Sequence, residues 1–175
     1  MTDEIKGMDR LLKLLDEIGS INISEGVRKA TVAVQGYAKA NCPEDTAQLV
    51  NSIQCMYQDN PHAGEYTGIT YTNLPYAGFV EFGTGPRGQE AHAGISPNVT
   101  VSYTQKSWWI HESQIDLHTA ERYKWFYINT PEGKFYLCTG QPAHPYMYPA
   151  LKDHEDEVVD IISKSIEEQI RRMGH

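Results

Sequence analysis

The sequence has no long hydrophobic run. Its longest apolar stretches, such as residues 76–80, fall far short of the roughly 18 residues that a membrane-spanning helix needs. The first residues, MTDE, show neither the basic region nor the apolar stretch of a secretory signal. We therefore expect a soluble protein that is made inside the cell and has no membrane partner.

Cysteines are few and follow no recognisable pattern. Cys42, Cys55 and Cys138 are odd in number, widely spaced and free of any Cys-x-x-Cys pair. Neither a disulfide framework nor a thiolate zinc site is therefore indicated. We expect these three residues to be buried, reduced thiols.

Basic residues are in the minority. There are 15 Lys and Arg against 23 Asp and Glu, which gives a formal net charge of −8. Neutralisation of phosphates by basic side chains supplies most non-specific affinity for nucleic acid. The charge therefore argues against a protein that grips nucleic acid, although it is compatible with one past which DNA slides without sticking.

Catalytic motifs are also missing. The chain contains no G-x-S-x-G, S-x-x-K or G-K-[ST] sequence. Residues 83–88 match the G-x-G-x-x-G string of dinucleotide-binding loops, which must open a helix whose N–H groups face the phosphates. Pro86 lacks that donor, and residues 91–99 contain glycine and proline without helical periodicity. A turn-rich loop is the prediction here, and no cofactor is expected.

One pair of residues resembles the start of a zinc-protease motif. His111 and Glu112 begin like H-E-x-x-H, but the second ligand position is Ile115, and His118 is seven residues from the first histidine. Helical ligands must be three or four residues apart to converge directly. We therefore predict no metal site and no small-molecule substrate. A metal-dependent hydrolase that uses His111, Glu112, His118 and a distant carboxylate is the alternative hypothesis.

Hydrophobic periodicity predicts three helices in a single domain spanning residues 1–175. The first covers residues 8–18, and the second is capped by Ser24 and ends before Pro43. The last follows Pro149. The predicted buried stripes of the second and last helices are Val27, Ala30, Val34, Tyr37 and Ala38, and Leu151, Val158, Ile162, Ile166 and Ile170, with Val159 and Ile161 widening the latter.

Alternating patterns predict strands at residues 52–58 and 66–72, joined as a hairpin through residues 59–64. A further strand is predicted at 106–110, and two helical turns capped by Asp116 at 116–123. Strands at 125–128 and 134–138 form a second hairpin through Thr130-Pro131-Glu132-Gly133. The predicted fold class is α+β, with an antiparallel sheet packed against a long N-terminal helical segment and a C-terminal helix.

Three sequence blocks, in order, carry a resemblance to a known family. They are residues 42–53 (CPEDTAQLVNSI), 76–84 (YAGFVEFGT) and 142–151 (PAHPYMYPAL). Together they resemble the small tail-completion, head–tail joining (neck) proteins of lambda-like siphophages and prophages. That family shows A-P-v-D-T-G-x-L-x-x-S-I, Y-A-x-x-v-E-F-G-T and P-x-P-F-[LM]-x-P-A-[LI] blocks in the same order.

The chain departs from this family pattern at three places. Ala47 stands at the usual glycine, and Tyr146 stands at the usual phenylalanine. Residues 87–140 form a longer and more aromatic segment than many relatives have. We interpret this segment as a family-variable insertion that contains the second hairpin.

The resemblance implies a structural, non-enzymatic component of the phage neck or tail end. It implies a homo-oligomer, usually a ring, that contacts other tail and neck proteins, is made in the host cytoplasm and resides in the virion. An acidic ring lumen would let DNA pass without adhesion. A regulatory binding module is a third hypothesis. Residues proposed for interaction or for structural motifs are Tyr76, Phe79, Glu81, Phe82, Gly83, Thr84, Pro145, Tyr146 and Pro149, with a tight turn at 81–84.

Overall fold

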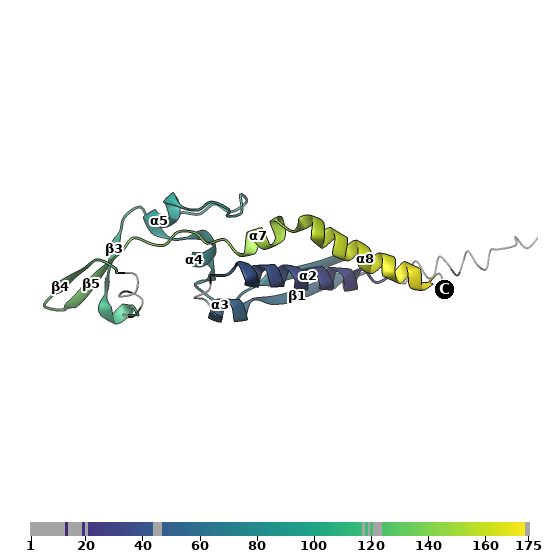
Figure 1. The fold of residues 1–175 in the computed structure, drawn as a ribbon, viewed down its shortest axis with the longest axis horizontal. Coiled ribbons are helices and arrows are strands. Elements are labelled where there is room, and N and C mark those ends of the chain that lie inside the picture. Colours follow the sequence, from purple (N-terminus) through teal and green to yellow (C-terminus); the bar gives the residue numbers. More distant parts are fainter. Residues whose placement is uncertain are drawn as a thin grey trace, which may run out of the picture.

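The computed structural model describes residues 13, 19, 21–43, 47–116, 118, 120 and 124–173. It confirms the predicted α+β class, with helices and two small antiparallel sheets that lie far apart along an elongated molecule (Figure 1). The predicted first helix, residues 8–18, lies almost entirely outside the described residues. The elements are α2 (Ile23–Asn41), α3 (Ala47–Ser52), β1 (Gln54–Asn60), β2 (Glu65–Tyr71), α4 (Ala77–Phe82), α5 (Gly85–Glu90), β3 (Trp108–His111), the 3-10 helix η1 (Glu112–Gln114), β4 (Tyr127–Thr130), β5 (Gly133–Cys138), α7 (Met147–Lys152) and α8 (Glu155–Met173).

Helix α2 is the centre of the larger part of the molecule, where it packs on the β1–β2 hairpin and on α8 (Figure 1). The predicted cap, Ser24, is wrong: Asn22 caps the helix, because its side chain accepts a hydrogen bond from the N–H of Glu25. Ser24 lies inside the helix, where its buried hydroxyl donates to the carboxylate of Asp59 over 2.6 Å. The hydroxyl that the local sequence pattern assigned to capping therefore binds Asp59, a residue distant in the chain. Helix α2 ends at Asn41, two residues before Pro43, as predicted.

The first predicted hairpin is confirmed, with strands that pair from Gln54 with Tyr71 to Asn60 with Glu65. Cys55 and Tyr57 are half-buried toward α2, whereas their neighbours on β1 are exposed, as the alternation predicted. The predicted start of the first strand, at residue 52, is wrong. Ser52 belongs to α3, where its hydroxyl donates to the carbonyl of Leu49, so the strand begins two residues later.

The C-terminal region forms two helices where the sequence predicted one. Helix α7 already begins at Met147, before Pro149, and Asp153 and His154 separate it from α8. The predicted buried stripe is only partly correct: Val158, Ile162 and Ile166 are half-buried, but Leu151 and Ile170 are about half exposed.

Small residues bring α2 and α8 close together beside the half-buried part of that stripe. A Cβ atom added at Gly26 would lie 3.2 Å from the Cα of Ile162, and Ser165 is 4% exposed. Glycine and serine therefore let the two backbones approach closely at this contact.

The second predicted hairpin is also confirmed, and its strand β5 is the centre of a three-stranded sheet ordered β3–β5–β4. The predicted strand at 106–110 corresponds to β3 at Trp108–His111. This distal sheet lies within residues 87–140, at the end of the molecule opposite the C-terminus (Figure 1). The helical turns predicted at 116–123 fall mostly outside the described residues, although the side chain of Asp116 does accept from the N–H of His118.

The helices of the described residues are too short or too polar to span a lipid bilayer.

Candidate functional site

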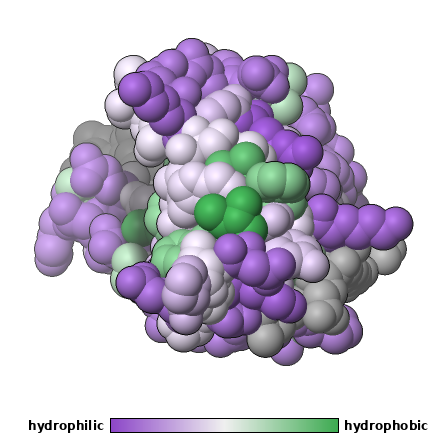
Figure 2. Space-filling model, turned by 90° about the vertical axis from the view of Figure 1, so that its left-hand side faces the viewer, coloured by the Kyte–Doolittle hydropathy of each residue, from purple (hydrophilic) through white to green (hydrophobic). Residues whose placement is uncertain are grey.

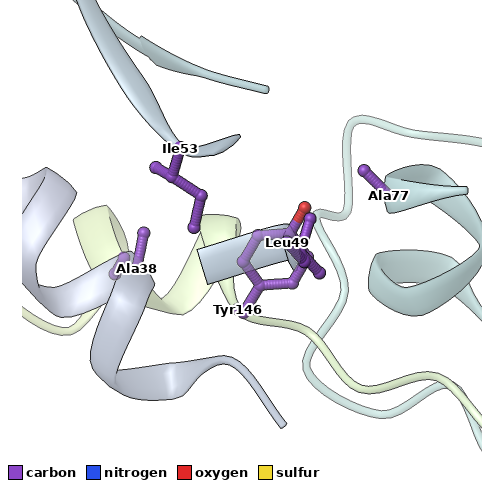
Figure 3. Packing of buried hydrophobic residues seen from close by; sticks show 6 residues of the cluster. Ala38, Leu49, Ile53, Ala77 and Tyr146 are labelled. Carbon is purple, nitrogen blue, oxygen red and sulfur yellow. The ribbon is translucent and has the colours of Figure 1, made fainter. Parts of the chain in front are cut away.

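The three sequence blocks fold into one hydrophobic core. Leu49 and Ile53 of the first block are 0% and 1% exposed, and Tyr146 and Ala150 of the third block are 1% and 0% exposed. Ala77 from the second block packs in the same cluster, together with Ala38 of α2 (Figure 3). Segments about a hundred residues apart in the chain therefore meet at one place, which we call the block junction: residues 42–43, 47–53, 76–84 and 142–151.

Glu81 is the main polar connection at the block junction. It lies on α4, is 6% exposed, and its carboxylate accepts hydrogen bonds from three successive backbone N–H groups. These donors belong to Tyr146 (2.8 Å), Met147 (2.9 Å) and Tyr148 (3.1 Å) at the start of α7. The first N–H groups of a helix have no partner within the helix, and a carboxylate there also interacts favourably with the helix dipole. Glu81 thus fixes the third block against the second.

Backbone contacts strengthen the same connection. The N–H of His144 donates to the carbonyl of Val80 over 2.8 Å, and the side-chain amide of Gln141 donates to the carbonyl of Phe79 over 2.7 Å. Thr84 and Gln141 form an isolated antiparallel bridge with hydrogen bonds in both directions. The whole of residues 79–84 is therefore held against residues 141–148.

Gly83 occupies a position that only glycine fills without strain. Its φ is +73° and its ψ is 176°, a region of backbone conformation essentially restricted to glycine. A Cβ atom there would lie 2.6 Å from the nitrogen of Ala143 and 2.9 Å from the carbonyl oxygen of Gln141. Because α4 ends here and the chain turns directly onto the third block, this conformation and this close approach are both required.

The predicted motif residues fall into a buried group and a group that is at least partly exposed, a distinction that the sequence did not provide. Glu81, Gly83 and Tyr146 are buried, whereas Phe79 is 58% exposed. The buried residues hold the block junction together. Only the exposed and half-exposed ones can touch another molecule directly; the half-buried members of the set are Tyr76, Phe82, Thr84, Pro145 and Pro149.

Sequence reasoning missed Gln141 as a connecting residue, because nothing local distinguishes a polar residue next to a proline-rich segment. It also named neither Leu49 nor Ile53 as site residues, although both lie in the first block and are fully buried. Their apolar character within that block was the available signal.

An open groove lies next to the block junction. It has a volume of about 530 Å³ and runs between α4 and α7. Its apolar lining includes Leu74, Phe82, Met147 and Leu151, and we call it the α4–α7 groove. At its rim, Lys152 and Glu155 pair with each other over 3.0 Å. The groove therefore presents a mostly uncharged surface.

Two ionisable side chains of the block junction, Cys42 and Tyr146, are held in their neutral forms. Burial, together with the nearby Glu81 carboxylate, raises the pKa of the Cys42 thiol to about 11, so the thiol is protonated at neutral pH. Burial, with a smaller effect from the same carboxylate, also raises the pKa of the Tyr146 hydroxyl. Both side chains behave as neutral core residues.

The residues of the alternative metal hypothesis have structural partners instead. The ring nitrogens of His111 lie 2.7 Å from the hydroxyl of Ser113 and 3.0 Å from the carbonyl oxygen of Glu132. The carboxylate of Glu112 accepts from the N–H of Lys134 over 3.0 Å. These bonds join η1 to the β4–β5 turn. His118 is exposed, and the described residues contain no group of three or more His, Cys, Asp or Glu side chains that could hold a metal ion.

The prediction of a turn-rich loop at residues 83–88 is wrong, because Gly85–Glu90 forms the short helix α5. Pro86 lies in its first turn, where a missing N–H is tolerated. The N–H of Gly88 donates to the carbonyl of Thr84, which closes this turn. The segment that leads into it is α4 and not a strand, so the arrangement of a dinucleotide-binding loop is not present here.

Part of the chain matches a known protein family. Residues 6–83, which are less than half of the chain, match the family model described as "Bacteriophage HK97-gp10, putative tail-component". No curated protein and no solved structure matches the chain. The matched region contains the first block and residues 76–83 of the second, whereas Thr84, the distal sheet and the third block lie outside it. Residues 6–83 are therefore similar to a phage tail component, and this similarity supports a structural role in a phage tail for the chain.

Proposed function

We propose that this protein is a structural subunit of the head–tail neck of a tailed phage or prophage, where it acts in tail completion or head–tail joining as part of a homo-oligomeric ring. The match of residues 6–83 to a phage tail component is the observation that carries the proposal. This match supports a role in the phage tail. The proposed position at the neck and the proposed ring rest on the resemblance of the three sequence blocks to the neck family.

The geometry of the block junction supports an assembly role. The second and third blocks are held together by distinctive residues: Glu81 binds the start of α7, and Gly83 at the end of α4 allows the backbone to approach residues 141–143 closely. Beside them lie an open apolar groove and the exposed ring of Phe79. A rigid junction that supports exposed apolar surface is what a subunit needs when its partners are other proteins.

The elongated shape is compatible with ring formation. The distal sheet and the α2–α8 part lie at opposite ends of the elongated molecule (Figure 1), so one copy can reach a neighbour at either end. Head-to-tail contacts between different surfaces produce closed rings when the rotation per subunit closes. We propose that neighbouring copies, and other tail and neck proteins, are the partners.

The acidic charge supports passage of DNA without adhesion. A net charge of −8 repels phosphates when the acidic side chains face a ring lumen. Helix α8 exposes much of this charge through Glu155, Asp156, Glu157, Asp160, Glu167 and Glu168. In a gel-shift assay with linear duplex DNA we expect no binding at low salt; tight, salt-sensitive binding would contradict a non-adhesive channel.

Deletion of the gene from its phage or prophage tests the proposed function. We expect induced cells to produce filled heads and separate tails that do not join, as counted by negative-stain electron microscopy, together with a loss of plaque-forming particles. Expression of the wild-type chain from a plasmid is the control and should restore joined particles. Complete, infectious particles in the deletion strain would exclude the proposed role.

A further inference from the structure

The distal sheet has one face that its own chain leaves open. Trp109 on β3 pairs with Leu137 on β5, and Ile128 on β4 pairs with Phe135, so that these side chains lie on the same face. Phe126 joins them, because its carbonyl accepts from the N–H of Leu137 and its ring lies 6.1 Å from that of Trp109. Trp109, Phe126 and Ile128 are 45%, 64% and 41% exposed. We call these five residues the open face.

The opposite face of the same sheet is packed against its own chain around Tyr136 and Cys138, whereas Tyr127 at its edge is exposed. Tyr136 and Cys138 point to that side and are 3% and 8% exposed. Trp108 lies against α5, where a Cβ atom added at Gly85 would come within 3.0 Å of its ring. The sheet is therefore anchored on one side only. Seen from this end, the molecule shows a hydrophobic patch surrounded by hydrophilic side chains (Figure 2).

The size of the open face indicates how it can be used. A fully exposed aromatic side chain offers about 150–250 Å², so the three most exposed residues together offer on the order of 300 Å². A stable complex usually buries about 800 Å² on each partner. A single contact made by the open face would therefore be too small for a stable dimer, whichever surface it meets. A contact of this size is effective when it is repeated around an assembly.

The α4–α7 groove has the properties that complement the open face. Its volume of about 530 Å³ is within the range of sites that enclose large aromatic groups, and Leu74, Phe82, Met147 and Leu151 line it. The open face is apolar except at its edge, where His111 lies against Phe135 and has both ring nitrogens hydrogen-bonded within its own chain. The rim charges of the groove, Lys152 and Glu155, pair with each other. Packing these two surfaces together would leave no charge buried without a partner.

Charge also distinguishes this groove from the long exposed face of α8. That helix exposes Val159 and Ile170, but charged side chains surround them, including Asp156 and the Asp160–Lys164 and Glu167–Arg171 ion pairs. An apolar partner that covered this face would have to remove these charged groups from water, which costs free energy. In a chain of net charge −8, two copies associate most favourably through their least charged surfaces.

We propose that the open face of one copy packs into the α4–α7 groove of a second copy, in a head-to-tail contact. The inference rests on the proposed function, because it identifies the two surfaces through which the subunits of the ring would meet. The two surfaces are different and lie at different places on one chain, so each copy can make two such contacts. Repetition around the ring compensates for the small area of each contact.

Two substitutions at exposed positions test the contact. Phe126→Asp places a charge on the open face, and Leu151→Asp places one in the groove, where Leu151 is 49% exposed. In sedimentation velocity at up to about 1 mM protein, we expect the wild-type chain to self-associate and each variant to associate at least about tenfold more weakly.

Mixing the variants gives the decisive result. In a 1:1 mixture, the intact open face of L151D meets the intact groove of F126D, so we expect dimers and no larger species. Tyr127→Asp is the matched control, because Tyr127 is adjacent in sequence and 45% exposed but points to the opposite face. It should associate like the wild type, and thermal melts should show that all three variants are folded.

Three outcomes would overturn the inference. Normal self-association of L151D alone would indicate that open faces meet each other. Dimerisation lost in the mixture, or no self-association of the wild type at any concentration, would show that the groove of a second copy is not the partner. None of these outcomes bears on the gene-deletion experiment, so failure of this contact and failure of the neck function are distinguishable.

Discussion

The carboxylate of Glu81 lies 2.8 Å from the backbone nitrogen of Tyr146, 65 residues further along the chain. This hydrogen bond joins two segments that the sequence marked separately, and the same carboxylate binds the next two N–H groups of α7. An acidic side chain that could have been read as a surface charge is thus an internal connection.

Replacing Glu81 by alanine should lower the free energy of unfolding by about 3 kcal/mol, because one buried and two part-buried N–H groups lose a charged acceptor. Urea denaturation measures the effect. Glu155→Ala is the control: its carboxylate pairs with Lys152 at the surface, and we expect a loss below about 1 kcal/mol. Equal losses in the two variants would contradict the internal role of Glu81.

Gly83→Ala should be destabilising by about 2 kcal/mol or more, because the φ of +73° is unfavourable for alanine and the added Cβ would meet backbone atoms of residues 141–143. Gly78→Ala provides a matched comparison on the same helix. Nothing lies within 4 Å of a Cβ added at Gly78, so alanine should be neutral or stabilising by up to about 1 kcal/mol. Thermal unfolding of both variants checks the difference in sign.

The hydrogen bonds from Ser24 and Arg28 on α2 to Asp59 on β1 should weaken in acid. The hydroxyl of Ser24 and the guanidinium of Arg28 donate to the carboxylate of Asp59 and hold its pKa below the usual value. Because the folded pKa is depressed, this contribution to stability is present above the unfolded pKa of about 4 and is lost as the pH falls through the folded pKa. The stability difference between wild type and Asp59→Asn should therefore shrink below about pH 4. A difference that grew in acid would contradict this sign.

Metal removal should have no effect on the distal sheet, since His111 and Glu112 already bind Ser113, the carbonyl of Glu132 and the N–H of Lys134. We expect EDTA to leave the melting temperature unchanged. His111→Ala should instead lower stability by about 1 kcal/mol through loss of these hydrogen bonds, with or without chelator. Stoichiometric zinc in the purified protein, together with destabilisation by EDTA, would favour the metal hypothesis.

Local patterns predicted the elements whose causes are local. Both hairpins were found because turn residues separate alternating strands, as at Thr130-Pro131-Glu132-Gly133, and because the strands pair with their nearest neighbours in sequence. The ends of helices were less predictable. Ser24 has the chemistry of a cap, but Asp59 binds it, and this partner is 35 residues away.

Partners distant in the sequence explain the remaining differences. Helical periodicity predicted that Leu151 and Ile170 are buried, but both are about half exposed. It did not reveal that Gly26 and Ser165 form the close contact between α2 and α8. The three blocks identified the candidate site, yet their arrangement around Glu81 depends on contacts between residues 79–84 and 141–148 that no local pattern contains. Identifying the residues of the open face required the register of β3, β4 and β5, which the sequence alone does not provide.

The most direct measurement of the central claim is in vitro complementation. Purified wild-type chain is added to a lysate that contains filled heads and tails from a phage with the gene deleted, and plaque-forming particles are counted against a buffer control. A structural subunit should restore infectivity with a titre that saturates as protein is added, and it should be found in the joined particles. Infectivity that stays at the buffer level, although the same chain expressed in the cell rescues the phage, would contradict direct action at the head–tail joint.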